Sequence, residues 1–119
     1  MKDARRQLGE AGEDLAAAAL KKQGYKILER NWRSPLGEVD LIAKHGRFLV
    51  LVEVKTRRSD AFGGPREAVS PAKQARLRRL ADYYVRQKRL GETPVRFDVV
   101  GITLTAAGPQ VEVIANAFG

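Results

Sequence analysis

The sequence predicts an α/β protein in which helices flank a central mixed β-sheet. In two segments, apolar residues recur every three to four positions, as in amphipathic helices. Elsewhere the chain contains short strand-like runs bounded by glycine and proline. The elements follow the order αβββαββ, which favours helices packed on a mixed sheet. At 119 residues, we expect one domain covering residues 1–119.

The first half of the chain is expected to contain one helix and three strands. The predicted elements are a helix over Arg5–Gln23 and strands over Tyr25–Asn31, Glu38–Lys44 and Arg47–Arg57. Leu8, Ala11 and Leu15 share one face of the helix, and Gly24 fits a left-handed cap just past its end. The dipeptide His45-Gly46 is expected to close a tight hairpin between the second and third strands.

The second half is expected to add one helix and two strands. Ser59–Pro65 has the composition of a loop. Ser70 is a suitable helix N-cap, with Pro71 at the first helical position and Gly91 as the expected C-terminal cap. Strands are predicted over Val95–Thr103 and Val111–Ala115.

Composition limits the function classes. The 22 Lys and Arg residues against 14 Asp and Glu give a net charge of +8, which indicates a polyanionic partner such as nucleic acid. A basic surface without a partner is the alternative. There is no cysteine, so disulfides and thiolate metal sites are excluded, and we expect a cytoplasmic protein. No apolar run is long enough to cross a bilayer, so no membrane partner is expected.

Three charged residues interrupt the apolar strands of the predicted hairpin: Asp40, Glu53 and Lys55. Alternate residues of a strand share a face, so Glu53 and Lys55 point the same way. If His45-Gly46 forms a two-residue turn, Asp40 faces Leu51 and lies diagonally from Glu53. The spacing therefore predicts that the three charges share one face of the sheet.

Two carboxylates beside a lysine have specific chemistry. Carboxylate oxygens suit a hard divalent cation such as Mg²⁺, which also binds substrate phosphate oxygens. The metal ion can stabilise negative charge on a reacting phosphate, and the ammonium can orient water or neutralise charge. The alternative is a glutamate–lysine pair that simply meets solvent at a sheet end.

These residues give the chain a resemblance to the PD-(D/E)xK nuclease superfamily. More narrowly, the chain is similar to the YraN family of small bacterial proteins, which are related to archaeal Holliday junction resolvases. The matching positions are Gly12-Glu13, Gly24-Tyr25, Arg30-Asn31, Gly37–Asp40, Val52–Lys55, Arg57, Phe62-Gly63, Pro65 and Lys73. One position departs from the superfamily pattern, since Val39 stands where its proline would be.

The resemblance implies a restriction-endonuclease-like core and metal-dependent hydrolysis of phosphodiester bonds. Asp40 and Glu53 would be metal ligands for Mg²⁺ or Mn²⁺, and Lys55 would be the catalytic lysine. Glu13 would reach the metal from the first helix, directly or through water, whereas its position in the helical pattern alone predicts a solvent-facing residue. Glu38 belongs to the same pattern with a less defined role.

Basic residues supply candidate nucleic-acid contacts. Arg57, Arg58 and Arg66 flank the predicted metal site, and Lys73, Arg76 and Arg79 lie on the polar face of the second helix. A solvated helix face is the alternative for the second group. Trp32 and Phe62 could stack on unpaired bases, although Trp32 also suits a partly buried core position.

With the resemblance, these observations favour an endonuclease-like protein, with DNA preferred to RNA as its substrate, at branched or repair intermediates. The residues by themselves leave open the choice between DNA and RNA and between junction, flap, single-stranded and nicked substrates. The alternative is a non-catalytic nucleic-acid-binding protein on a nuclease-like fold. No helix-turn-helix, zinc-finger or RNP signature is present, so contacts are expected to follow the shape of the nucleic-acid backbone more than its base sequence. Related resolvases dimerise to cut two strands, so the resemblance leaves open that this protein forms a homodimer.

Overall fold

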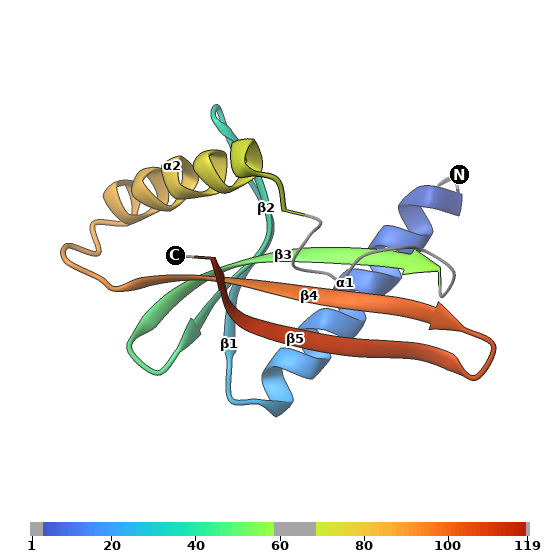
Figure 1. The fold of residues 1–119 in the computed structure, drawn as a ribbon. Coiled ribbons are helices and arrows are strands. Elements are labelled where there is room, and N and C mark those ends of the chain that lie inside the picture. Colours follow the sequence, from blue (N-terminus) through green and yellow to red (C-terminus); the bar gives the residue numbers. More distant parts are fainter. Residues whose placement is uncertain (1–3, 59–68, 119) are drawn as a thin grey trace.

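In the computed structural model, one five-stranded sheet lies between two helices (Figure 1). The structure describes residues 4–58 and 69–118, with side chains from residue 11 onward. The elements are α1 (Ala4–Lys22), β1 (Lys26–Ser34), β2 (Gly37–His45), β3 (Phe48–Arg58), α2 (Pro71–Gln87), β4 (Val95–Thr105) and β5 (Gly108–Phe118). This order and the mixed sheet confirm the predicted fold class. The predicted loop Ser59–Pro65 and Arg66 lie outside the described residues.

The strands follow one another across the sheet in chain order, from β1 to β5. Neighbouring strands are antiparallel, except that β3 and β4 are parallel. A parallel pair requires a long crossover, and α2 lies within the connection from β3 to β4. The sheet is therefore mixed, and its parallel pair consists of the middle strand β3 and its neighbour β4.

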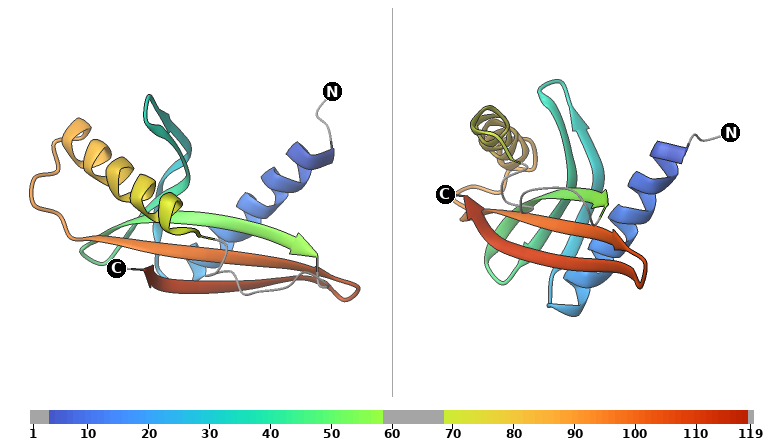
Figure 2. Two further views of the ribbon diagram at one scale, coloured as in Figure 1. Left: turned by 45° about the horizontal axis from the view of Figure 1, so that its top comes forward. Right: turned by 45° about the vertical axis from the view of Figure 1, so that its right-hand side comes forward.

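The two helices cover opposite faces of the sheet (Figure 2). Leu49 and Leu51 of β3 pack in the cluster that contains α2, whereas Val50 and Val52 pack in the cluster that contains α1. All four side chains are almost completely buried. Strand β3 is thus the central strand, covered on both faces, as the run of apolar residues predicts.

Helix α2 begins as predicted and ends earlier. Ser70 caps it, because its Oγ accepts a hydrogen bond of 3.2 Å from the backbone N–H of Lys73, and Pro71 is the first helical residue. The expectation of a cap at Gly91 is wrong: α2 ends at Gln87, and Arg89 already has a left-handed conformation with φ of 53°. The left-handed residue that stops the helix is therefore an arginine.

The register of the β2–β3 hairpin differs from the prediction by two residues. His45 pairs with Phe48, so the turn residues are Gly46 and Arg47, and the predicted pairing of Lys44 with Arg47 is wrong. Gly46 has a φ of 58°, while Arg47 does not have positive φ. A two-residue turn with glycine first needs positive φ only at that glycine, whereas His45-Gly46 would place histidine there. The turn chemistry thus explains the observed register.

Helix α1 packs closely on β3 at Gly12. A β-carbon built at this residue would lie 2.3 Å from Oγ1 of Thr56 and 3.6 Å from Cδ1 of Ile102. Glycine in a helix interior is destabilising by about 1 kcal/mol relative to alanine. Tight packing of the helix on the sheet accounts for its presence here. No helix in the described part of the chain is both long and apolar enough to span a membrane.

A buried polar network lies on the α1 side of the sheet. Asp98 is 1% exposed, and Arg96 donates to both of its carboxylate oxygens, each at 2.9 Å. The hydroxyl of Tyr25 donates at 2.5 Å, and the backbone N–H of Asn116 donates at 3.0 Å. Arg96 also donates to Nδ1 of His45 at 2.9 Å. The buried charge of Asp98 is therefore fully paired and hydrogen-bonded.

Candidate metal centre and nucleic-acid interface

The regular alternation of side chains in β2 breaks at Asp40. Val39 packs in the α2-side cluster, but Leu41, two residues later, packs in the α1-side cluster. In a regular strand both would share a face. The pairing of β2 with β3 ends at Leu41 and Val52, and Oδ2 of Asp40 accepts a hydrogen bond of 2.8 Å from the backbone N–H of Val54. Asp40 thus lies where the two strands diverge.

In the corrected register, the residue pair that would follow Leu41 and Val52 is Asp40 and Glu53, rather than Asp40 and Leu51. Both predicted metal ligands therefore lie at the point where the two strands diverge. The electrostatics of Asp40 agree with a close approach of these carboxylates.

Burial, followed by the negative charges of Glu53 and Glu13, raises the pKa of Asp40 to about 6 from its ordinary value of 3.8. The hydrogen bond from Val54 and the positive charge of Lys73 act in the opposite direction. Like charges that are held together disfavour ionisation. Acids from α1 and β3 therefore act on Asp40 of β2, and a bound cation would relieve that repulsion.

Glu53 is buried, with 8% of the residue exposed, and its Oε1 forms an ion pair with Nζ of Lys73. Lys73 belongs to the first turn of α2, so this contact connects the helix to the end of the central strand. The sequence predicted Lys73 as a nucleic-acid contact, whereas the structure directs its ammonium to Glu53.

Glu13 is only partly buried on α1, and its Oε2 accepts a hydrogen bond of 2.8 Å from Nδ2 of Asn31. Asn31 lies on β1 and has a φ of 52°, an uncommon backbone conformation that asparagine tolerates better than most residues. Asn31 thus orients Glu13, a contact that helical periodicity alone does not indicate.

The remaining predicted site residues differ in exposure. Lys55 is exposed and lies two residues after Glu53 on β3, and Arg58 at the end of the strand is also exposed. Arg57 is partly buried and Arg66 lies outside the described residues. On α2, Arg76 and Arg79 are exposed. Together with Lys73, Ser70 and Ala72 they line a pocket of about 380 Å³. The helix thus presents a basic surface next to Glu53.

The carboxyl groups of Asp40, Glu53 and Glu13 have the chemistry that a hard cation requires, but they do not form a complete metal site. The bonds described above engage only one oxygen each of Asp40, Glu53 and Glu13. In the part of the chain that the structure describes, no three acidic or histidine side chains are arranged to hold a metal ion by themselves. Mg²⁺ commonly uses one or two carboxylates with waters and substrate phosphates. Asp40 and Glu53 could supply those two carboxylates.

Asp40→Asn is expected to raise the free energy of unfolding at pH 7.5 by about 2 kcal/mol in metal-free buffer. In the folded wild type this carboxyl ionises near pH 6, above its ordinary 3.8. Its contribution to stability is therefore complete below pH 4 and is lost as pH rises through 6. A difference of about two between the folded and unfolded pKa values corresponds to almost 3 kcal/mol, and partial solvent access reduces this energy.

Urea denaturation of the two proteins between pH 4 and pH 8 measures this difference. Asparagine can still accept the hydrogen bond from the N–H of Val54, so the gain should vanish near pH 4. A difference that is independent of pH would contradict the assigned environment of Asp40.

With its mixed sheet, two flanking helices and acids where β2 and β3 diverge, the protein has the organisation of a restriction-endonuclease-like α/β domain. Residues 12–102 match the family described as "Uncharacterised protein family UPF0102", and the chain belongs to that family, which confirms the identification as a YraN-type protein. All three relatives given below are named as UPF0102 proteins, and these names state no activity.

Similarity to these relatives extends over nearly the whole chain. The protein of Moorella thermoacetica is 50% identical over 118 residues, covering 96% of this chain and 97% of its own. That of Caldicellulosiruptor saccharolyticus is 47% identical over 116 residues, covering 96% and 98%. That of Syntrophus aciditrophicus is 47% identical over 110 residues, covering 92% and 87%.

Proposed function

We propose that this protein hydrolyses phosphodiester bonds in DNA at branched or repair intermediates, with Mg²⁺ or Mn²⁺ as cofactor. The main support is the electrostatic coupling of Asp40 with Glu53 where β2 and β3 diverge. Burial and the nearby charge of Glu53 make ionisation of Asp40 unfavourable, and a bound cation would offset that cost. The net charge of +8 and the basic surface of α2 support an anionic substrate.

In this proposal Asp40 and Glu53 hold the metal ion. The ion would stabilise charge on the scissile phosphate and make a bound water more acidic. Lys55, exposed two residues beyond Glu53, orients the attacking water or neutralises phosphate charge. Glu13, oriented by Asn31, would reach the metal ion directly or through water. Lys73 would leave Glu53 and pair with a substrate phosphate instead.

The test is a panel of branched, nicked, single-stranded and linear DNAs incubated with Mg²⁺, Mn²⁺ or EDTA. We expect cleavage of at least one branched substrate with either metal and none with EDTA. Matching RNA substrates should be cut more slowly. Absence of any metal-dependent product from a pure, folded sample would refute the proposed activity.

One observation favours a second candidate, a non-catalytic nucleic-acid-binding protein. The ion pair from Lys73 already neutralises Glu53, which a structural role for the acid would also require. This candidate predicts strongly salt-dependent DNA binding that EDTA does not weaken, with no cut product. The same substrate panel distinguishes the two functions.

A further inference from the structure

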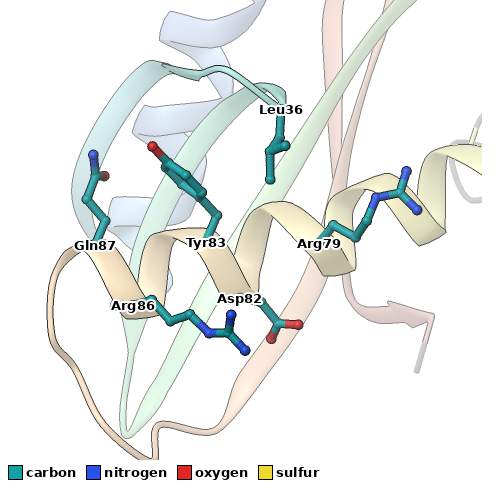
Figure 3. Close-up of a pocket in the computed structure, with 6 residues that line it drawn as sticks. All are labelled: Leu36, Arg79, Asp82, Tyr83, Arg86 and Gln87. Carbon is teal, nitrogen blue, oxygen red and sulfur yellow. The ribbon is translucent and has the colours of Figure 1, made fainter.

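A pocket of about 590 Å³ lies between the β1–β2 turn and the exposed side of α2 (Figure 3), and Asp40, Glu53 and Glu13 are not among its lining residues. Its lining residues are Leu36, Arg79, Asp82, Tyr83, Arg86 and Gln87. Leu36 extends from the turn toward the helix, and the ring of Tyr83 points back toward the turn. The pocket thus has an aliphatic wall and an aromatic wall.

The walls of the pocket suit a nucleobase. Leu36 is 48% exposed at the tip of a turn, which leaves its apolar surface available. Tyr83 packs against Trp32, and their ring centroids are 6.0 Å apart. Bases stack on such rings, and each stacked base contributes about 1–3 kcal/mol to binding. Arg79 and Arg86 outnumber Asp82, the one acid of the lining, so the pocket keeps a positive charge that favours a phosphate beside the base.

A second pocket lies further along α2 and shares one lining residue with the first. Arg79 also lines the smaller pocket that contains Arg76 and Lys73, the residue that contacts Glu53. Lys73 and Tyr83 are ten residues apart, which corresponds to about 15 Å along a helix. A strand with its phosphates on the basic residues would therefore span these two points with only a few nucleotides.

We infer that this pocket binds one unpaired nucleotide of a DNA strand whose neighbouring phosphates follow α2 toward Glu53. A paired base is covered by its neighbours and its partner, so only a base outside the duplex can enter. This inference rests on the proposed function for its nucleic-acid substrate. It specifies that substrate as DNA with an unpaired base close to the scissile phosphate.

Fluorescence anisotropy in EDTA, at one salt concentration, tests the inference without cleavage. The probes are a duplex, the same duplex with a one-nucleotide bulge, and a bulge that carries an abasic site. Wild-type protein should bind the bulged duplex about 10-fold tighter than the other two. Tyr83→Ala and Leu36→Ala should each remove most of this preference, whereas Tyr83→Phe should retain it.

Leu90→Ala is the matched control, because Leu90 is also an exposed leucine, 41% exposed, and lies outside the pocket. It should leave the preference unchanged. Leu36 is on a turn, so its variant should fold even if loss of Tyr83 destabilises α2. Equal binding of natural and abasic bulges by wild type would overturn the inference and leave DNA binding intact, which is also the result if the pocket serves an acidic peptide. Absence of binding to every DNA, in EDTA and again in Mg²⁺, would overturn the proposed function as well.

Discussion

Glu53→Gln is expected to reduce metal-dependent DNA cleavage by about 1,000-fold while the protein stays folded. Glutamine keeps the shape of the side chain and can accept a hydrogen bond from Lys73, but it lacks the charge that a hard cation requires. Stabilisation of phosphate charge by a bound metal contributes several kcal/mol, and about 4 kcal/mol corresponds to a 1,000-fold change in rate. Single-turnover cleavage of the best substrate in the panel measures the change.

Glu92→Gln is the matched control for this substitution. Glu92 is an exposed glutamate in the connection from α2 to β4, and it is not part of the family pattern that includes Glu38 and Glu53. Its replacement should change the rate less than about 3-fold, because surface substitutions away from a site have small effects. If Glu53→Gln retains cleavage in a scrupulously pure sample, Glu53 is not a metal ligand.

A thermal shift separates loss of metal binding from loss of substrate binding. Mg²⁺ should raise the melting temperature of wild type and of Glu92→Gln, because a ligand of the folded state stabilises it. It should not raise that of Glu53→Gln. A shift that persists without Glu53 would place the metal elsewhere.

The fold was predictable because each element has a strong local pattern. The run from Phe48 to Val52 could only be a strand covered on both faces, and Ser70-Pro71 defined the start of α2 correctly. The hairpin register was not predictable from the glycine alone, since Gly46 could be either the first or the second residue of a two-residue turn. The two-residue shift keeps the parity of the strand, so residues assigned to β3 faces stayed on them.

The site was less predictable than the fold because it depends on irregular backbone. The prediction that Asp40 shares a face with Glu53 and Lys55 assumed a regular β2 strand. In the structure, the alternation of side chains breaks between Val39 and Leu41. Sequence spacing also does not bring Lys73 to Glu53 or Asn31 to Glu13, since both contacts connect residues from different elements. The residues Asn31 and Lys73 belong to the motif that resembles the nuclease family, so that resemblance was the available signal.

Asp98→Ala is expected to lower the free energy of unfolding by about 4 kcal/mol, more than any other single substitution considered for this protein. The change leaves Arg96 with its guanidinium beside Tyr25 and His45 and without its counter-charge. Breaking a buried ion pair from one side costs about 3–5 kcal/mol. Urea denaturation at pH 7 measures the loss, and Asp14→Ala, which removes an exposed ion pair with Arg30, should cost less than about 1 kcal/mol.

The partner substitution shows whether the loss arises from the unpaired charge. If Arg96 is destabilising only because Asp98 is absent, adding Arg96→Met to Asp98→Ala should recover about 1–2 kcal/mol, since the apolar side chain removes the buried cation. The pKa of Tyr25, raised to about 12 by burial and by its bond to Asp98, should fall in Asp98→Ala, which spectrophotometric titration detects. Equal costs for Asp98→Ala and Asp14→Ala would mean that this network does not stabilise the fold.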